Sequence, residues 1–220
     1  EAITGETVGK ILFTSGSTGL PKGVITTNAM MACNQQMIRQ ALAFLEDEPP
    51  VLLDWMPWNH VAGGSHNVGI ALYNGGSFYI DDGQPTPGRF GRTLENLAMV
   101  QPTFFMNVPK AYEFLVAAFP DNPHVRRNLF ARLKLLQYAG AGLAQHVFDG
   151  LAEAARAETG ERVLIITGYG STETAPFAFT TTWAVEEAGH IGLPAAGMSI
   201  KLVRNGEKHE LRLKGPNVTP

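Results

Sequence analysis

The sequence predicts an α/β fold in which a mainly parallel sheet is flanked by helices. Strand-like and helix-like segments alternate along most of the chain, the pattern of parallel strands joined by crossover helices. The 220 residues are 45% hydrophobic, which is enough to supply one buried core. After Gly197 the pattern changes to short strands around a turn at Asn205-Gly206, which is a hairpin signal. We therefore predict an α/β part over residues 1–196 and the start of a β subdomain over residues 197–220.

Short apolar segments followed by turn or loop residues are predicted as the strands. They are Lys10 to Phe13, Val51 to Met56, Ser77 to Ile80, Thr103 to Val108, Lys134 to Tyr138 and Val163 to Thr167. Helices are predicted at Asn28 to Leu45, Arg92 to Val100, Pro109 to Phe119 and Ala144 to Glu158. The first carries its apolar residues on one face, with Thr27 placed to cap it, and Pro109 suits a first helical turn.

The composition argues against several classes of protein. Lys and Arg number 17 against 20 Asp and Glu, a net charge of −3 that offers no basic surface for nucleic acid. We expect neither a membrane span nor a signal peptide, since no apolar run is long enough and the first residues lack a positive region. The single cysteine, Cys33, excludes an internal disulfide. We expect a soluble cytoplasmic protein, whose oligomeric state the sequence leaves open, a homo-oligomer included.

A loop rich in Gly, Ser and Thr follows the first predicted strand. Its residues are Thr14, Ser15, Gly16, Ser17, Thr18, Gly19, Leu20, Pro21, Lys22 and Gly23. Glycines let backbone N–H groups approach phosphate oxygens, hydroxyls add donors, and Lys22 brings positive charge. It is not a Walker A loop, because Gly23 rather than Ser or Thr follows Lys22. Its place after a strand, where ligands bind in open α/β sheets, favours polyphosphate binding over an ordinary surface loop.

A second loop after a strand, Thr167 to Thr174, combines an aromatic ring, hydroxyls and a carboxylate. Tyr169 can pack against a base, Thr172 can donate to a phosphate, and Glu173 is a hard oxygen ligand suited to Mg²⁺. A capped helix start is an equally good interpretation of the segment. Ser171 or Thr172 would then be the cap, and Glu173 would favour the helix dipole.

Two further segments follow predicted strands. Asp54 to Gly64 holds two tryptophans, a proline and a histidine, and can line a pocket in which His60 orients a carboxylate; a hydrogen-bonded structural histidine is the alternative. The segment from Tyr138 ends in small residues that would let a flat base or ring lie against the backbone, with helix packing as the alternative. These small residues are Gly140, Ala141 and Gly142.

The four segments, in this order, resemble the adenylate-forming superfamily of acyl-CoA synthetases, luciferases and peptide-synthetase adenylation domains. Thr14 to Gly23 is similar to its phosphate-binding signature at every fixed position. Tyr169 to Glu173 resembles its aromatic-Gly-x-Thr-Glu motif, and Met56 to His60 its Met-Pro-x-aromatic-His segment, with Asn59 in place of the aromatic residue. His190 to Pro194 is similar to its Gly-x-Pro segment. The likeness covers the whole chain and implies the central part of the superfamily's large N-terminal domain.

The resemblance implies an ATP-dependent ligase that activates a carboxylic acid as its acyl-adenylate and then forms a thioester with coenzyme A. In that superfamily the threonine matching Thr172 meets the α-phosphate, and the glutamate matching Glu173 binds magnesium. Lys22 and its loop would hold the β- and γ-phosphates, and His60 would orient the acid. The other residues expected at the nucleotide are Thr14, Ser15, Gly16, Ser17, Thr18, Gly19, Gly140, Ala141, Gly142, Tyr169, Gly170 and Ser171.

Within the superfamily the chain looks most like feruloyl-CoA synthases, which join hydroxycinnamic acids to coenzyme A. A pocket lined by Trp58 and Tyr138 would suit such an aromatic acid. Use of a fatty or another aryl acid, and a non-catalytic nucleotide-binding module, remain open alternatives. A serine hydrolase is poorly supported, because the nearest approach to its Gly-x-Ser-x-Gly motif is Gly63 to Asn67.

We also expect the chain to be a fragment. It begins without methionine, and Leu211 to Pro220 reads as a strand cut before its continuation. Members of the superfamily continue with a ribose-binding aspartate, a hinge and a C-terminal domain that carries a catalytic lysine, and none of these has a match here. The chain alone is therefore expected to be inactive.

Overall fold

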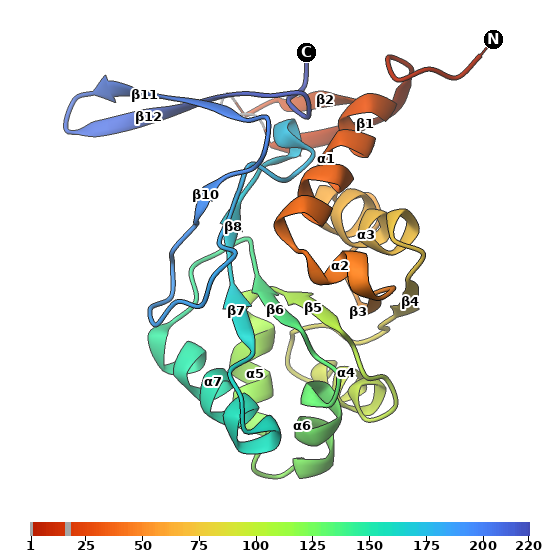
Figure 1. Ribbon diagram of the computed structural model, residues 1–220, viewed down its shortest axis with the longest axis vertical. Helices are drawn as coiled ribbons and strands as arrows, with labels where there is room; N and C mark the ends of the chain where they lie inside the picture. The colour runs from red at the N-terminus through yellow and green to blue at the C-terminus, as the bar shows by residue number, and fades with distance from the viewer. Residues whose placement is uncertain (1, 16–18) are drawn as a thin grey trace.

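The computed structural model of the chain describes residues 2–15 and 19–220 (Figure 1). Its central layer consists of the strands β3 (Val51–Asp54), β4 (Ser77–Ile80), β5 (Phe104–Asn107), β6 (Leu135–Tyr138) and β7 (Leu164–Ile166). β3 pairs in parallel with β4, and β6 pairs in parallel with both β5 and β7. The mainly parallel arrangement predicted from the sequence is confirmed.

The two groups of parallel strands meet where β3 lies beside β5. The Thr103 N–H donates to the Val51 carbonyl oxygen over 3.0 Å, and the Val51 N–H donates to the Thr103 hydroxyl over 2.9 Å. The spatial order is therefore β4-β3-β5-β6-β7. The chain runs outward from β3 to β4 and then returns past β3 to β5, so the direction of winding reverses between β3 and β5. Open parallel sheets bind ligands at such a reversal, outside the carboxyl ends of the strands.

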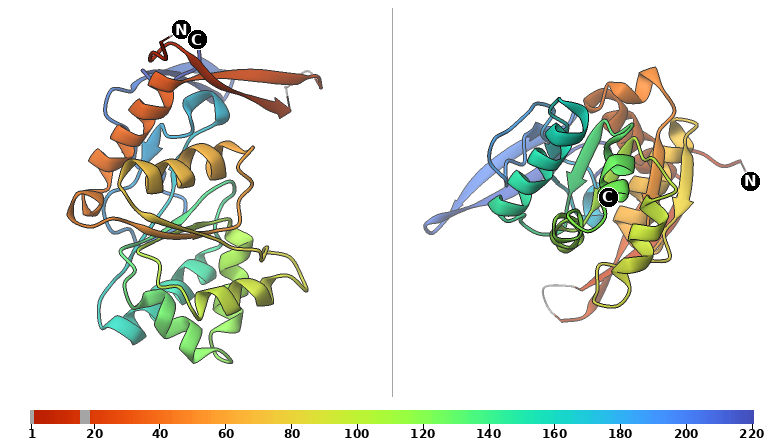
Figure 2. Two further views of the ribbon diagram at one scale, coloured as in Figure 1. Left: turned by 90° about the vertical axis from the view of Figure 1, so that its right-hand side faces the viewer. Right: turned by 90° about the horizontal axis from the view of Figure 1, so that it is seen from below.

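Helices cover both faces of this layer, as Figure 2 shows. One face carries α1 (Asn28–Ala41) and α3 (Val68–Tyr73), and the other carries α4 (Phe90–Leu97), α5 (Pro109–Ala118), α6 (Pro123–Phe130) and α7 (Gln145–Thr159). Successive strand residues enter opposite cores: Phe104 and Leu135 pack on the α1 side, and Phe105 and Leu136 on the α7 side. Burial of both faces explains why these strands read as continuous apolar runs.

The predicted first helix is shorter in the structure. Thr27 caps α1 as expected, because its hydroxyl accepts a hydrogen bond from the Met30 N–H over 3.3 Å. The helix ends at Ala41 rather than Leu45, and α2 (Phe44–Asp47) is a separate turn. The predicted helix had merged the two because Leu42 and Leu45 continue the apolar face and are buried in the same core.

Three helical segments were not predicted. They are α6, the π-helix η1 (Ala62–Asn67) and α3, which follows η1 directly. Gly63 and Gly64 argue against a helix in the sequence, because glycine is a poor helix former. In the structure they are needed for close packing: a Cβ on Gly64 would overlap the Trp58 carbonyl oxygen, and one on Gly63 would lie 2.6 Å from the Pro57 oxygen.

The phosphate-loop candidate occupies a different setting from the one expected. β1 (Val8–Ser15) is followed by β2 (Pro21–Thr27), and the two strands pair antiparallel, with Thr14 opposite Lys22. The loop therefore joins the strands of a hairpin and does not follow a strand of the parallel sheet. The strand β2 was missed because Pro21 and Gly23 interrupt an otherwise β-branched run, and such residues are depleted in strands.

The C-terminal part is antiparallel. β8 (Gly168–Tyr169), β9 (Phe179–Thr180) and β10 (Leu193–Pro194) form a small sheet. The predicted hairpin is present as β11 (Ser199–Asn205) and β12 (Lys208–Lys214), and it projects away from the helical layers (Figure 1). Because Asn205 pairs with Lys208, its turn residues are Gly206 and Glu207 rather than Asn205 and Gly206, with Gly206 at φ 62°.

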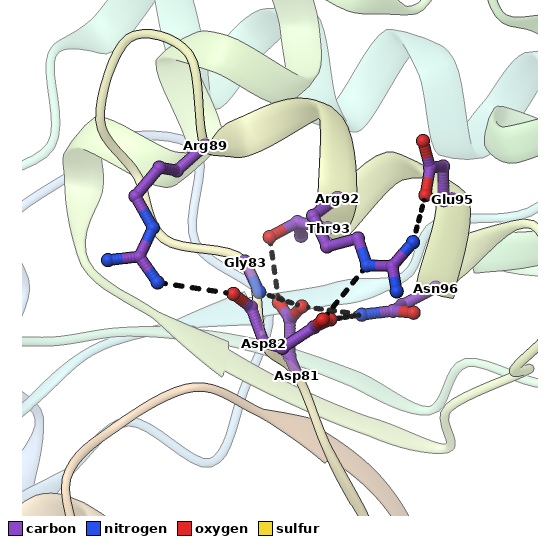
Figure 3. A network of polar contacts seen from close by, with 8 residues as sticks. All are labelled: Asp81, Asp82, Gly83, Arg89, Arg92, Thr93, Glu95 and Asn96. Carbon is purple, nitrogen blue, oxygen red and sulfur yellow. Dashed lines mark hydrogen bonds and ion pairs between the residues drawn. The ribbon is translucent and has the colours of Figure 1, made fainter.

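A buried carboxylate fixes the connection from β4 to α4 (Figure 3). Asp81 accepts hydrogen bonds from the Gly83 N–H over 2.8 Å, the Thr93 hydroxyl over 2.7 Å and the Asn96 amide over 2.8 Å. These donors satisfy a group that would be costly to bury alone. The network holds the start of α4 against the end of β4, and its polar groups form hydrogen bonds with one another.

Candidate active site

A cavity of about 680 Å³ lies at the carboxyl ends of β3, β5, β6 and β7, beside the reversal of winding. Each of these strands contributes lining residues from its end or from the loop that follows it. They include Trp55, Met56, His60 and His66 after β3, Met106 and Val108 at β5, Tyr138, Gly140, Ala141 and Gly142 at β6, and Thr167, Gly168, Tyr169 and Gly170 at β7. Three of the four predicted segments are thus brought together around one cavity.

The loop after β6 presents backbone to the cavity. Gly140, Ala141 and Gly142 line it, and Gly140 has φ 87°, a conformation that favours glycine. Tyr138 also lines the cavity, but its ring is buried in the core beside α7, and its hydroxyl accepts a hydrogen bond from the Gly189 N–H over 2.7 Å. Burial raises the pKa of this phenol. Small residues here leave room for a flat group against the backbone.

The segment after β7 places an aromatic ring beside the same cavity. Tyr169 lines it, remains 43% exposed, and meets the Phe179 ring edge-on at 6.1 Å between centroids. Gly170 has to be glycine, because a Cβ there would overlap the Pro176 carbonyl oxygen. The ring of Tyr169 therefore stands where a flat ligand in the cavity can contact it.

The next residues form a capped turn. Thr172–Thr174 is the 3₁₀ helix η2, and Ser171 is its N-cap, with the Ser171 N–H donating to the Thr174 hydroxyl over 2.9 Å. The capped helix start weighed from the sequence is therefore present as a single short turn. Thr172 and Glu173 are half-buried and stand next to the lining residues without being among them.

After β3 the structure separates two tryptophans. Trp55 lines the cavity, and its indole N–H donates to the Asn107 side-chain oxygen over 2.8 Å, which fixes the ring. Trp58, the tryptophan predicted for the pocket, is 58% exposed, packs edge-on against Phe78, and is not among the lining residues. His60 is exposed and lines the cavity; its Nδ1 accepts from the Ala62 N–H over 3.1 Å.

His66 is a cavity residue that the sequence analysis did not identify. It lies on η1, is 3% exposed, and its Nδ1 is 2.8 Å from the Asn67 side-chain oxygen. Burial lowers the pKa of His66 to about 4, although the Asn67 hydrogen bond acts in the opposite direction. Because Gly63 and Gly64 argued against a helix, the sequence did not predict that His66 lies on one and points inward. No other pattern in the sequence indicates its position.

The predicted phosphate loop is described only at its ends. Gly16, Ser17 and Thr18 lie outside the described residues. Thr14, Ser15, Gly19 and Lys22 stand at the tip of the β1–β2 hairpin, and none of them is among the lining residues of the cavity. Lys22 is exposed.

The hairpin nevertheless lies against the turn that carries Glu173. β2 is in contact with η2, and Thr219 links the two. The Thr219 hydroxyl donates to the Ile25 carbonyl oxygen and its N–H donates to the Glu173 carbonyl oxygen, both over 2.8 Å. The elements that carry Lys22 and Glu173 are therefore neighbours at one side of the cavity.

The described residues contain no group of three or more histidine, cysteine, aspartate or glutamate side chains placed to hold a metal. A lone carboxylate such as Glu173 is still compatible with Mg²⁺, which commonly takes one or two protein carboxylates and completes its shell with water and phosphate oxygens. Within the described residues no helix is long and apolar enough to cross a membrane.

Known proteins resemble the chain along nearly all of its length. A feruloyl-CoA synthase from Amycolatopsis sp is 27% identical over 217 residues, covering 94% of this chain and 41% of the relative. An anthranilate–CoA ligase from Pseudomonas aeruginosa is 28% identical over 218 residues, covering 94% and 38%. The structure of a malonyl-CoA ligase with methylmalonyl-CoA and AMP bound has a TM-score of 0.74 and 27% identity, over 96% of this chain and 44% of that one.

These relatives are longer than the chain, and their names refer to different substrates. The chain spans less than half the length of each of them, and the acids in their names differ. The parallel sheet with helices on both faces agrees with the fold of the solved relative. The model of the AMP-binding family, described as "AMP-binding enzyme", matches residues 2–220. The chain therefore belongs to the AMP-binding family of adenylate-forming enzymes.

Proposed function

We propose that the chain forms the ATP- and acid-binding part of an acid:CoA ligase. The whole protein would join a carboxylic acid to the α-phosphate of ATP, release pyrophosphate, and pass the acyl group to the thiol of coenzyme A. The observation that carries this proposal is the cavity itself. It brings the His60 segment, the Gly140 to Gly142 loop and the Tyr169 segment to one place, although they are far apart in the sequence.

The cavity offers suitable surroundings for an adenosine group. Tyr169 is 43% exposed and lines the cavity, and the loop from Gly140 to Gly142 presents backbone with little side chain. A base stacked on Tyr169 would gain the affinity that aromatic rings give to planar ligands. We assign this end of the cavity to the nucleotide.

The polyphosphate would extend toward the hairpin. Lys22 would neutralise the β- and γ-phosphates and Thr172 would donate to the α-phosphate, while Mg²⁺ bound at Glu173 would offset charge on the phosphate oxygens. The contact between β2 and η2 supports this division, because it sets both groups on neighbouring elements. His60 would orient the acid, and holding the carboxylate in line with the α-phosphate makes the attack close to unimolecular.

We propose an aromatic acid, such as a hydroxycinnamate, as the substrate. Trp55, Phe177 and Phe179 supply aromatic surface to the cavity, which suits a planar acyl group. Two of the relatives named above support this choice, since the names feruloyl-CoA synthase and anthranilate–CoA ligase both refer to aromatic acids.

Calorimetric titration of the purified chain tests the proposal. The ligands are AMP, ferulate and feruloyl sulfamoyl adenosine, a hydrolysis-resistant mimic of the acyl-adenylate. The mimic should bind on the order of tenfold or more tightly than AMP, because one molecule occupies both parts of the cavity. Equal affinities for AMP and the mimic would indicate a nucleotide-binding module without an acid site. Failure of both to bind would contradict the proposal.

A further inference from the structure

One wall of the cavity carries two buried polar side chains, His66 and Gln137, among apolar ones, and Gln137 lies opposite Met106 in the β5–β6 pair. His66 lines it, and the His66 ring packs against Phe104 and Phe177, with centroids 6.1 and 6.5 Å away. Met106, Val108 and Trp55 line the same cavity and pack in the same hydrophobic cluster as Phe104 and Phe177. A group that enters this region loses its water and meets mainly apolar surface, so a polar atom there has a large effect on which ligand fits.

The tautomer of His66 follows from its neighbour. The Asn67 amide nitrogen points to the Met56 sulfur, 3.9 Å away, which leaves the Asn67 oxygen to accept from Nδ1 of His66 over 2.8 Å. Nδ1 therefore carries the ring proton and Nε2 carries a lone pair. Burial lowers the pKa of the ring to about 4, so the imidazole is neutral near pH 7.

Nε2 is the nitrogen of the His66 ring that remains available to accept a hydrogen bond from a ligand. Among the described residues it has no hydrogen-bond partner, and it is not one of the fully enclosed polar atoms that lack a partner. Because His66 is 3% exposed and lines the cavity, the surface that Nε2 retains faces the cavity. A lone acceptor in such a place is satisfied only by water or by a donor on the bound molecule.

We propose that His66 is a specificity-determining residue for the acid, and that Nε2 accepts a hydrogen bond from a hydroxyl or amino group on the ring of a neutral aromatic acid. This inference rests on the proposed function and narrows its substrate class. None of the described residues that line the cavity is Lys or Arg, so a second carboxylate on the acid would be buried without a cationic partner. Dicarboxylic acids are therefore poor substrates, because an unpaired buried charge is very costly.

The test compares acyl sulfamoyl adenosines that differ only in the ring. Calorimetry on the chain gives the affinities of cinnamoyl, 2-, 3- and 4-hydroxycinnamoyl and 4-carboxycinnamoyl mimics. The best hydroxy isomer should bind about five- to tenfold more tightly than the cinnamoyl mimic, the gain expected for one neutral hydrogen bond. The carboxy mimic should bind more weakly than the cinnamoyl mimic. Tight binding of the carboxy mimic would overturn the charge argument.

Substitution of His66 tests whether this residue causes the tighter binding of the hydroxy mimic. His66→Phe keeps a ring against Phe104 but removes the acceptor, so the preference for the hydroxy mimic should fall to about one. His124→Phe is the matched control, since His124 is exposed on α6, and it should keep the preference of the unmodified chain. AMP binding shows whether each variant has formed its nucleotide site. A preference that survives in His66→Phe would overturn the role of His66.

A measurement on the unmodified chain covers the case in which the His66→Phe variant does not fold. The ¹⁵N resonances of the His66 ring should show a protonated Nδ1 and an unprotonated Nε2. Nε2 alone should shift when the hydroxy mimic replaces the cinnamoyl mimic. An Nε2 resonance that is identical in the two complexes would contradict the proposal. If no acyl mimic binds better than AMP, the proposed ligase function fails instead, and the two failures are thereby distinguished.

Discussion

At the scale of single residues, Asp54 links the stability of the fold to pH. It ends β3 and is 4% exposed; its Oδ1 accepts from the Met56 N–H over 3.1 Å, and Oδ2 has no partner among the described residues. Burial raises the pKa of Asp54 from 3.8 to about 6. The folded state thus favours the protonated acid. This stabilisation is complete below the ordinary pKa of 3.8 and is lost as the pH rises through about 6.

We expect Asp54→Asn to stabilise the chain at about pH 8, by up to roughly 3 kcal/mol, and to change little at about pH 4. Asparagine keeps an acceptor for Met56 and removes the charge. Urea unfolding across this range measures the effect. His66, with a lowered pKa, loses its contribution as the pH falls, so variant and unmodified chain are compared at each pH. Asp121→Asn, at an exposed site, is the control. A difference independent of pH would contradict this account.

A substitution of Glu173 distinguishes the two interpretations of its turn, a Mg²⁺ site and a capped helix start. As a ligand of Mg²⁺ it contributes charge, which Glu173→Gln removes while keeping the shape. We expect the variant to need a higher Mg²⁺ concentration for ATP binding, measured by titrating ATP at a series of Mg²⁺ concentrations. Glu207→Gln, in the turn of the β11–β12 hairpin, should leave that requirement unchanged. If Glu173→Gln also leaves it unchanged, Glu173 serves the capped turn alone.

At the scale of elements, the sequence predicted what is locally encoded. β5, β6 and β7 are apolar because both their faces are buried, so composition alone located them. The hairpin partner β2 and the π-helix η1 depend on contacts between distant residues, and their glycines and proline concealed them. The site shows the same division: Tyr169 and Gly140 belong to recognisable motifs, whereas Trp55 and His66 became cavity residues only through the folding of the segment after β3.

The glycines of η1 give an element-scale prediction. Gly64→Ala places a Cβ against the Trp58 carbonyl oxygen, where backbone must move, and we expect a loss of about 1–3 kcal/mol in the free energy of unfolding. Gly91→Ala is a matched change within α4, where a Cβ would meet nothing within 4 Å, and it should stabilise by about 0.5–1 kcal/mol. Chemical denaturation of both variants measures the contrast. Equal effects would show that the close approach at Gly64 is relieved at little cost.

At the scale of the whole molecule, the proposed site divides between two regions, the cavity and the β1–β2 hairpin. The Gly140 loop after β6 and Tyr169 on β8 line the cavity, and the antiparallel β1–β2 hairpin supplies Lys22. Thr219 joins the hairpin to the Glu173 turn through two backbone carbonyl oxygens. Under the proposed function, the cavity recognises the adenosine of the nucleotide and the hairpin recognises its terminal phosphates.

This division predicts different effects on ATP and AMP. Lys22→Ala should weaken ATP binding about tenfold at low salt, because a charge-assisted contact with phosphate is lost, and should leave AMP binding unchanged, because AMP lacks the β- and γ-phosphates. Tyr169→Ala should weaken both nucleotides by a similar factor, since both carry the adenine ring. Calorimetric titration of the unmodified chain and of each variant with each nucleotide provides the six affinities needed.

Ionic strength adds an independent check on the same pair of variants. Lys22 is exposed, so its attraction for phosphate is screened by salt, and the ATP affinities of the unmodified chain and Lys22→Ala should converge as salt rises. The effect of Tyr169→Ala depends on stacking and should change little over the same range. Equal weakening of AMP and ATP by Lys22→Ala would mean that the hairpin does not reach the terminal phosphates, and that the cavity of the parallel sheet accounts for nucleotide binding without it.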